Sequence, residues 1–266
     1  MEEADYLKSR FRELANRCIS DSYLTHSEFL SMSEQGIFYE MLKEEHVSYL
    51  EKKYHGVSYF FYGGHEEDDR KILYFIPSYL TKEEALEEES LGATFSCLHI
   101  SPRNPKFADT LTHRDYLGAL MHLGVRREMY GDILTDGTEG YVFVMNTVKD
   151  SIQNELGKIR HTSVKVEEIL PKDCPFEMRF ELEDINVSSN RLDCILAEIY
   201  HLSRRDAQVL IANACIFIDG MTCMDNSHTL KENDRVSVKG KGKFIFLGEG
   251  KLSRKNRLFC KIKRYC

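Results

Sequence analysis

The stretch that decides the fold runs from Arg191 to Lys243, RLDCILAEIYHLSRRDAQVLIANACIFIDGMTCMDNSHTLKENDRVSVKGKGK. Its first part predicts a helix with apolar residues at i, i+3, i+4 and i+7, namely Leu192, Ile195, Leu196 and Ile199. A second helix repeats that spacing at Ala207, Leu210, Ile211 and Ala214, with Ser203 as its expected N-cap and Asp206 completing a capping-box variant. A strand, a turn and a further strand follow, and this order of elements is that of an α+β domain.

The polar residues of this stretch gather away from the apolar stripes. Arg204, Arg205 and Gln208 lie on the outer face of the second predicted helix, where neither arginine has a packing reason to be Arg. Replacing both arginines is therefore expected to leave folding nearly intact. The segment 235–243 alternates apolar and basic residues, so one side of this last strand is expected to pack and the other to present cations.

This stretch resembles the S-four RNA-binding domain, named for small-subunit ribosomal protein four. The resemblance rests on five short motifs, which are Arg191-Leu192-Asp193, Ser203-Arg204, Leu210-Ile211, Asp219-Gly220 and Asn233-Asp234. Two positions depart from the family pattern, since Asp219 stands in place of the usual Asn and Asn233 in place of the usual Gly. Both residue types tolerate turn geometry. We therefore expect a C-terminal S-four domain over residues 180–266.

The same stretch supplies the first set of candidate RNA contacts. Phosphate contacts are expected from Arg191, Arg204, Arg205, Lys239, Lys241 and Lys243. Ser203 and Gln208 are expected to form hydrogen bonds with sugar or base edges. Folded RNA is recognised largely by shape and through phosphate and 2′-hydroxyl contacts, which suits a basic helix beside a basic strand.

Charge is distributed unevenly along the 266 residues. The formal net charge is −7, which by itself argues against a nucleic-acid ligand. From residue 235 to residue 266, however, eleven Lys or Arg accompany one acidic residue, Glu249, so this arm carries +10 and residues 1–234 carry −17. A basic C-terminal arm directly after the helical motif favours contact with phosphate over a tail that only aids solubility.

The eight cysteines form no C-x-x-C motif and stand at no metal-binding spacing with His. We therefore expect reduced, mostly buried thiols, no metal and no cofactor. The N-terminus is acidic and amphipathic and lacks the apolar segment of a secretory signal, and no run of eighteen apolar residues occurs. These features predict a cytoplasmic protein that does not enter a membrane.

Residues 1–80 are expected to form a helical region with a β-hairpin. Helices are predicted within residues 1–53, interrupted by loops near residues 19–27, and Phe29 is placed in one of these helices. The hairpin is predicted from Val57–Tyr62 and Lys71–Ile76. The aromatic run 59–62 is more typical of the core of a small sheet than of a base-stacking platform.

Residues 81–172 predict a central domain. Thr81 and Thr112 are the expected N-caps of two helices, and Asp115 completes the second capping box. Strands are expected near residues 94–100, 132–134, 141–145 and 163–169, with a last helix near 149–156. Four strands and two helices after Thr94 in this order resemble an RNA recognition motif, although the aromatic signature of typical members is missing. Pro171 and Pro175 mark the linker to the last domain.

A second set of motifs lies in this central domain and is unusually specific. It comprises His113-Arg114-Asp115-Tyr116-Leu117-Gly118-Ala119-Leu120-Met121, Leu123-Gly124-Val125-Arg126-Arg127 and Gly131-Asp132-Ile133. These motifs resemble the central RNA-binding domain of the YlmH family, whose members join a helical N-terminal region, this domain and a C-terminal S-four domain. The resemblance covers almost the whole chain. Arg114, Arg126 and Arg127 are candidates for a second RNA contact, with surface ion pairs as the alternative.

The resemblance implies a bacterial, non-enzymatic protein that binds ribosomal RNA and tRNA. Members of the family associate with large ribosomal subunits that carry obstructed peptidyl-tRNA and take part in ribosome-associated quality control. We expect the same partners here, and a monomer. The alternatives are an S-four-containing RNA-modifying enzyme and an interaction scaffold in cell division.

Two motifs also occur in enzymes. The HRD of the protein-kinase catalytic loop needs an Asn where this chain has Leu120, and neither D-F-G nor a Gly-rich phosphate loop is present. Arg191-Leu192-Asp193 also resembles the catalytic RLD of pseudouridine synthases, but only 73 residues follow Asp193 and the last domain uses them. Asp193 is better interpreted as a carboxylate at a helix start, and His113 to Asp115 as chiefly architectural.

Overall fold

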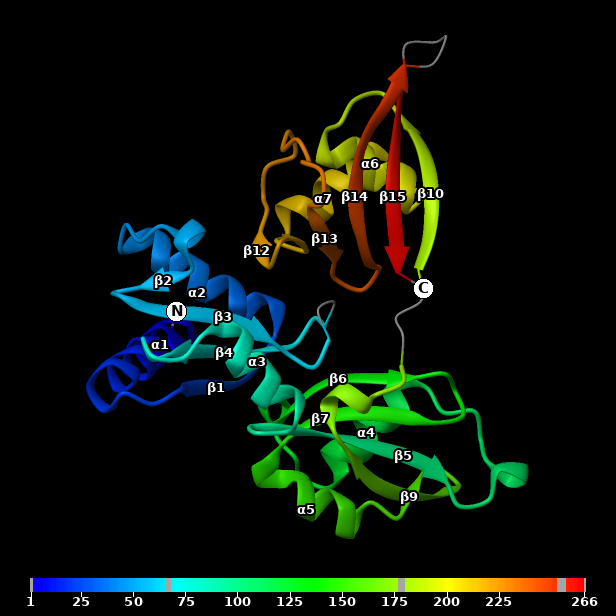
Figure 1. The fold of residues 1–266 in the computed structure, drawn as a ribbon. Helices are drawn as coiled ribbons and strands as arrows, with labels where there is room; N and C mark the ends of the chain where they lie inside the picture. The colour runs from blue at the N-terminus through cyan, green and yellow to red at the C-terminus, as the bar shows by residue number, and fades with distance from the viewer. Residues whose placement is uncertain (1, 66–67, 177–179, 253–256, 266) are drawn as a thin grey trace. The chain divides into compact units, whose positions relative to one another are not determined.

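The structure is a computed structural model that describes residues 2–65, 68–176, 180–252 and 257–265. It divides into two compact units, Met1–Phe176 and Glu177–Cys266 (Figure 1). The first unit holds a four-stranded and a five-stranded sheet, and the second holds a six-stranded sheet. The fold is therefore α+β, as predicted.

The N-terminal half of the first unit is a four-stranded antiparallel sheet with helices against it. Its strands have the order β1-β4-β3-β2. The elements are α1 (Glu2–Asp21), β1 (Thr25–Leu30), α2 (Met32–Glu44), the 3-10 turn η1 (Tyr49–Glu51), β2 (Lys53–Tyr54), β3 (Val57–Tyr62) and β4 (Lys71–Ile76). The predicted hairpin is confirmed as β3 and β4, in which Tyr59 pairs with Phe75. Its predicted polar turn includes Glu66 and Glu67, which lie outside the described residues.

The placement of Phe29 in a helix is wrong, because Phe29 lies in β1. It pairs with Ile72 of β4, and its ring is fully buried. Pairing with a distant strand overrides the weak local preference of this short segment. The next helix, α2, begins at once because Ser31 and Glu34 form a capping box.

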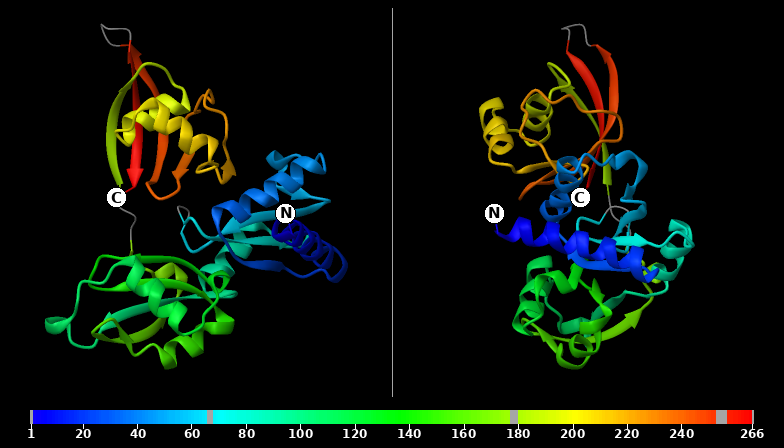
Figure 2. Two further views of the ribbon diagram at one scale, coloured as in Figure 1. Left: turned by 180° about the vertical axis from the view of Figure 1, so that it is seen from behind. Right: turned by 90° about the vertical axis from the view of Figure 1, so that its left-hand side faces the viewer.

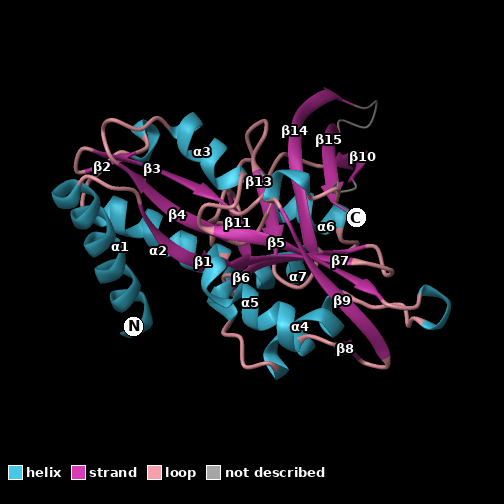
Figure 3. Cartoon of the chain, turned by 60° about the horizontal axis from the view of Figure 1, so that its bottom comes forward, coloured by secondary structure: helices cyan, strands magenta, loops and turns pink. Residues whose placement is uncertain are grey.

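The central part of the first unit has the strand order of an RNA recognition motif. After α3 (Lys82–Ser90) come β5 (Phe95–Pro102), the 3-10 turn η2 (Pro105–Phe107), α4 (His113–His122), the 3-10 turn η3 (Arg127–Met129), β6 (Tyr130–Thr135), β7 (Gly140–Met145), α5 (Asn146–Glu155), β8 (Lys158–Ile159), β9 (Thr162–Ile169) and the 3-10 turn η4 (Pro171–Asp173). The sheet order is β6-β7-β5-β9-β8, so the four long strands lie in the order second, third, first, fourth. Helices α4 and α5 pack on one face of this sheet (Figure 3) through Tyr116, Leu120 and Ile152.

The other face of the central sheet is covered by the N-terminal half. The ring of Phe143 lies 5.2 Å from the ring of His65, and a Cβ on Gly64 would come within 2.5 Å of Phe143. Phe95 packs at 5.6 Å against Phe29 of β1. An RNA recognition motif uses this face, and its aromatic side chains, to stack bases. Here Phe95 and Phe143 on this face are covered by the N-terminal half, so their rings are not available to stack bases.

The second unit is a six-stranded antiparallel sheet with two helices. Its elements are β10 (Phe180–Val187), α6 (Leu192–Ile199), α7 (Arg204–Ala212), β11 (Ile216–Ile218), β12 (Met221–Thr222), β13 (Arg235–Val238), β14 (Gly242–Leu252) and β15 (Leu258–Tyr265), in the sheet order β10-β15-β14-β13-β11-β12. The predicted order of helix, helix, strand, turn and strand is confirmed. The predicted stripe extends too far at Ala214, because α7 ends at Ala212 and Ala214 is exposed with φ of +53°.

The two departures from the S-four pattern fall at backbone positions that need a positive φ. Asp219 has φ of +49° and is followed by Gly220 at +82°, and Asn233 has φ of +72°. Asn and Asp adopt this left-handed conformation more readily than other residues with a side chain. The two replacements therefore preserve the turns.

The predicted basic arm is part of the sheet. Within residues 235–265, strands β13, β14 and β15 take up all described residues except 239–241, which connect β13 to β14, and 257. Residues 253–256, which hold Arg254 and Lys255, lie outside the described part. Helices α6 and α7, drawn in yellow, cover one face of this sheet (Figure 2). The remaining described cations of the arm are thus held on a rigid surface.

Candidate nucleic-acid interface

Three of the predicted RNA-binding residues converge on Asp193, the second residue of α6. The side chain of Asp193 is fully buried. Its Oδ1 accepts a hydrogen bond from Nε of Arg191 at 3.1 Å. Its Oδ2 accepts three more, from Nη2 of Arg191 at 3.2 Å, Nε of Arg204 at 2.9 Å and Nε2 of Gln208 at 2.9 Å. We call this group of four residues the Asp193 centre.

The carboxylate of the Asp193 centre is ionised, and the arginines around it expose positive charge to solvent. Burial acts to raise the pKa of Asp193, but hydrogen bonds from Arg191, Gln208 and Arg204 outweigh it and hold the pKa well below its ordinary value. The carboxylate is enclosed, whereas the side chains of Arg191 and Arg204 are 38% and 54% exposed. Two guanidinium groups are thus fixed by one buried negative charge, and their free edges can bind phosphate.

Ser203 and Arg205 lie beside this centre at the start of α7. Ser203 is the N-cap, as predicted: its Oγ accepts a hydrogen bond from the backbone N–H of Asp206 and donates one to the Asp206 carboxylate at 2.7 Å. Arg205 is exposed and forms no hydrogen bond or ion pair with any residue that the structure describes. Arg205 therefore lacks a packing role, as expected. The same expectation is wrong for Arg204, whose guanidinium holds Asp193.

The three predicted lysines occupy the connection between β13 and β14 and the start of β14. Lys239 and Lys241 are exposed, and their backbone N–H groups are bonded to the carbonyls of Cys215 and Val238. Lys243 lies with its Nζ 4.9 Å from the ring centroid of Tyr265. This turn is tied to the end of α6, because the hydroxyl of Tyr200 donates to the carbonyl of Gly242 at 3.3 Å.

Two of the predicted arginines of the central domain are exposed, and the third, Arg127, is half-buried. Arg114 is exposed in the first turn of α4, and Arg126 forms an ion pair with Glu128 at 3.1 Å. Arg127 packs over the ring of Tyr130 at 4.4 Å and donates to the carbonyls of Tyr130 and Gly131. Burial lowers the pKa of Arg127. Its guanidinium is therefore engaged in holding the backbone, while Arg114 and Arg126 remain at the surface.

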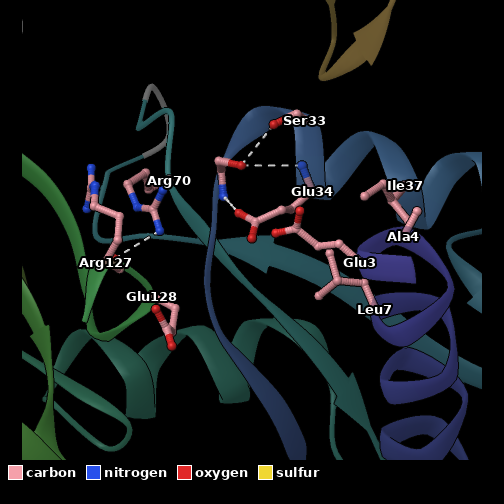
Figure 4. A pocket seen from close by; sticks show the side chains of 10 residues that line it. Glu3, Ala4, Leu7, Ser33, Glu34, Ile37, Arg70, Arg127 and Glu128 are labelled. Atoms are coloured by element: carbon pink, nitrogen blue, oxygen red, sulfur yellow. Dashed lines mark hydrogen bonds between the residues drawn. The ribbon is translucent and has the colours of Figure 1, made fainter. Parts of the chain in front are cut away.

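Arg127 is half-buried and lies beside the buried Arg70 at the edge of a cavity of about 610 Å³ (Figure 4). Arg70 donates from Nε to the carbonyl of Tyr130, and from Nη2 to the carbonyls of Phe29 and Arg127. Burial, with a smaller contribution from the charge of Arg127, lowers the pKa of Arg70 to about 10. These bonds join the N-terminal half to the central sheet. Sequence reasoning missed Arg70, which lies outside every motif.

The Gly131-Asp132-Ile133 motif also joins the two halves of the first unit. The carboxylate of Asp132 accepts hydrogen bonds from the backbone N–H groups of Asp69 at 2.7 Å and Arg70 at 3.2 Å. A Cβ on Gly131 would come within 2.6 Å of the ring of Phe29. Asp and Gly are therefore required here by packing and backbone hydrogen bonding.

In the His113–Met121 motif, the third and fourth residues, Asp115 and Tyr116, also have structural roles. Asp115 accepts hydrogen bonds from the backbone N–H and the Oγ1 of Thr112, at 2.8 and 2.7 Å, and this confirms the predicted capping box. Tyr116 is buried beneath Gly140, where a Cβ would come within 2.4 Å of its ring. The two remaining polar residues of the motif, His113 and Arg114, are exposed.

The described residues contain no group of three or more His, Cys, Asp or Glu that could hold a metal ion. Within the same residues, no helix is both long enough and apolar enough to cross a membrane.

Comparison with known proteins agrees with these motifs. Residues 95–173 match the family model described as "Putative RNA-binding domain in YlmH". A Bacillus subtilis (strain 168) protein named "Ribosome-associated protein quality control protein P2" is 29% identical over 187 residues, which are 69% of this chain and 68% of that protein. A solved structure titled "Cell division protein ylmH from Streptococcus pneumoniae" is 22% identical, with a TM-score of 0.45, and covers 63% of this chain and 91% of that chain.

The strand order of the central sheet and the match over residues 95–173 define the class, an RNA-binding protein of α+β fold. The match over residues 95–173 and the Bacillus subtilis relative support the predicted resemblance to the YlmH family.

Proposed function

We propose that this chain binds ribosomal RNA and tRNA through the surface formed by the starts of α6 and α7. On this proposal the second unit is an S-four domain, and the protein acts as a cytoplasmic monomer on large ribosomal subunits that carry peptidyl-tRNA, in ribosome-associated quality control. The name of the Bacillus subtilis relative supports the process. The observation that carries the proposal is the Asp193 centre, with two half-exposed guanidinium groups around one buried carboxylate.

The geometry of the Asp193 centre suits a folded RNA backbone. Guanidinium groups held in place lose little conformational entropy when they bind phosphate, and Arg is well suited to bidentate contacts with it. Arg205 adds a third cation on the same helix, next to the backbone N–H groups at the N-terminus of α7, which favour anions. Lys239 and Lys241 supply further exposed charge on the turn joined to α6.

The same geometry argues against catalysis by Asp193. A general base or nucleophile must reach the reacting atom of its substrate. The Asp193 carboxylate is fully buried and accepts four hydrogen bonds from Arg191, Arg204 and Gln208. Its arrangement favours the positioning of the arginines, and therefore a binding protein over an RNA-modifying enzyme.

Sedimentation of cell extract in a low-salt gradient, with translation stalled, tests the proposal. We expect the protein to travel with large subunits, and Arg205→Ala to shift part of it toward the soluble fractions. A protein found only in soluble fractions would refute the assignment. Ribonuclease treatment separates the rival class, because a division scaffold keeps its partner when RNA is digested.

A further inference from the structure

The six-stranded sheet of the second unit has a second face that the two helices do not cover. Side chains alternate between the faces of a strand. On β15 the core takes Cys260 and Ile262, while Phe259, Lys261 and Lys263 point to the opposite side. Helices α6 and α7 lie on the core side only (Figure 2). We call the opposite side the outer sheet face, defined by Phe180, Leu182, Phe259, Lys261, Lys263 and Tyr265.

The outer sheet face brings rings and cations together in neighbouring rows. Strand register pairs Phe180 of β10 with Tyr265 of β15, and Leu182 with Lys263. The Nζ of Lys263 lies 3.9 Å from the ring centroid of Phe180 and 5.8 Å from that of Tyr265. Lys243 of β14 is the register partner of Ser237 and approaches Tyr265 from the other side. The rings of Phe180 and Tyr265 are thus each next to at least one ammonium group.

Large apolar side chains on this face are open to solvent. Phe180 is 49% exposed, Leu182 71% and Phe259 42%. They lie on regular strands, within one sheet face of one compact unit, and do not belong to its core cluster. Exposed apolar groups that gather in this way are typical of a binding surface.

The charge of the outer sheet face is positive. Lys261 forms no hydrogen bond or ion pair with any described residue, and its register partner on β10 is Asp184. The acidic neighbours of Asp184 along β10 point to the core side, where Glu183 pairs with Arg264 at 3.5 Å. Charge complementarity therefore favours a polyanionic ligand over a protein ligand with few acidic residues.

We propose that the outer sheet face binds single-stranded RNA. Bases stack on Phe180, Phe259 and Tyr265, and Lys261 and Lys263 contact the phosphates between them. Sheets that combine aromatic platforms with cations bind single strands in this way, with little sequence preference. The face is separate from the Asp193 centre, since α6 and α7 lie on the other side of the sheet. The inference shares with the proposed function only that the ligand is RNA.

Equilibrium binding of the full chain to a labelled twelve-residue oligouridylate tests this proposal, with an abasic strand of equal length for comparison. Replacing Phe180→Ala together with Lys263→Gln is expected to weaken binding to oligouridylate about tenfold, through a lost stacking platform and a lost phosphate contact. The abasic strand is expected to bind the unaltered protein no better than oligouridylate binds the double variant. Equal binding of the abasic and uridylate strands, or an unchanged affinity in the double variant, would overturn the proposal.

Two single variants keep the test decisive. Lys261→Gln changes a solvent-exposed side chain, so folding is retained, and the log–log salt slope for oligouridylate is expected to become shallower by about 0.7. Arg205→Ala is the matched control on the helical side: it is expected to weaken binding of tRNA and to leave oligouridylate binding unchanged. An unchanged salt slope in Lys261→Gln overturns the outer-face proposal alone, whereas unchanged tRNA binding in Arg205→Ala counts against the proposed function alone.

Discussion

Replacing Asp193→Asn removes the charge at the centre of the proposed RNA site with the smallest change in shape. Asn can present its oxygen to the three donors that now meet Oδ2, but its amide then opposes Nε of Arg191. Breaking a buried ion pair costs about 3–5 kcal/mol. Arg191 and Arg204 are partly exposed and can turn to water, so we expect a smaller cost, about 2–3 kcal/mol in the free energy of local unfolding. This cost raises the equilibrium constant for local opening of α6 and α7 about 30- to 150-fold.

Hydrogen exchange of the full chain, followed by mass spectrometry at neutral pH, measures this cost where it arises. Amides of α6 and α7 should exchange faster in Asp193→Asn, while those of β5 and β7 in the first unit keep their rates. Affinity for tRNA should fall as well, because the guanidinium groups are no longer held in place.

The matched control for this change is Asp206→Asn, which removes the same charge from an exposed position on α7. It should alter exchange only slightly, because an Asn at this position can still bond with Ser203. If α6 exchanges at the unaltered rate in Asp193→Asn, the carboxylate does not organise the site and the reasoning fails. Unchanged affinity for tRNA despite faster exchange would show instead that the arginines held by Asp193 are not part of the RNA site.

Four further outcomes follow from the same contacts. Arg204→Ala should lower the free energy of unfolding of the second unit by about 1–2 kcal/mol, the value of a partly exposed charged hydrogen bond, whereas Arg205→Ala should change it by less than about 0.5 kcal/mol; urea titration compares the two. Ser203→Ala should cost about 1 kcal/mol through the lost cap, measured in the same way. Asp115→Ala should lower the melting temperature with unchanged RNA affinity, and the reverse result would make the His113–Met121 motif a contact site. The pKa of Asp193 is depressed below the value of about 3.9 for an unfolded Asp, so its contribution is complete above that pH and is lost as pH falls; acid titration should therefore destabilise the unaltered second unit more than the Asp193→Asn variant.

Elements that depend on local signals were predictable from the sequence. Thr81, Thr112 and Ser203 each cap the helix that their surroundings predict, and the strand order of the central sheet follows from short strands set around two helices. Strand β1 was not predictable in the same way, because its six residues show no clean alternation and pair with β4 about 45 residues later. The capping box of Ser31 and Glu34 was a local signal that the prediction overlooked.

The candidate site shows the same division. Spacing places Arg204 and Gln208 one turn apart on α7, but only the packing of α6 on α7 brings both to Asp193, 11 and 15 residues earlier. Arg127 shows the opposite case, since its neighbours in sequence predict an exposed cation and the fold turns it onto Tyr130. A side chain's partner across the fold, rather than its residue type, decides whether it is available to a ligand.

The covered face of the central sheet also bears on how this protein can be dissected. Cutting the chain near residue 81 would separate Phe143 and Phe95 from Gly64, His65 and Phe29, which shield them. Such a fragment would expose these aromatic rings to solvent, on a sheet with the strand order of an RNA recognition motif. The exposed rings would promote self-association and non-specific binding to RNA. An affinity measured on the fragment would therefore reflect the newly exposed surface rather than the intact protein.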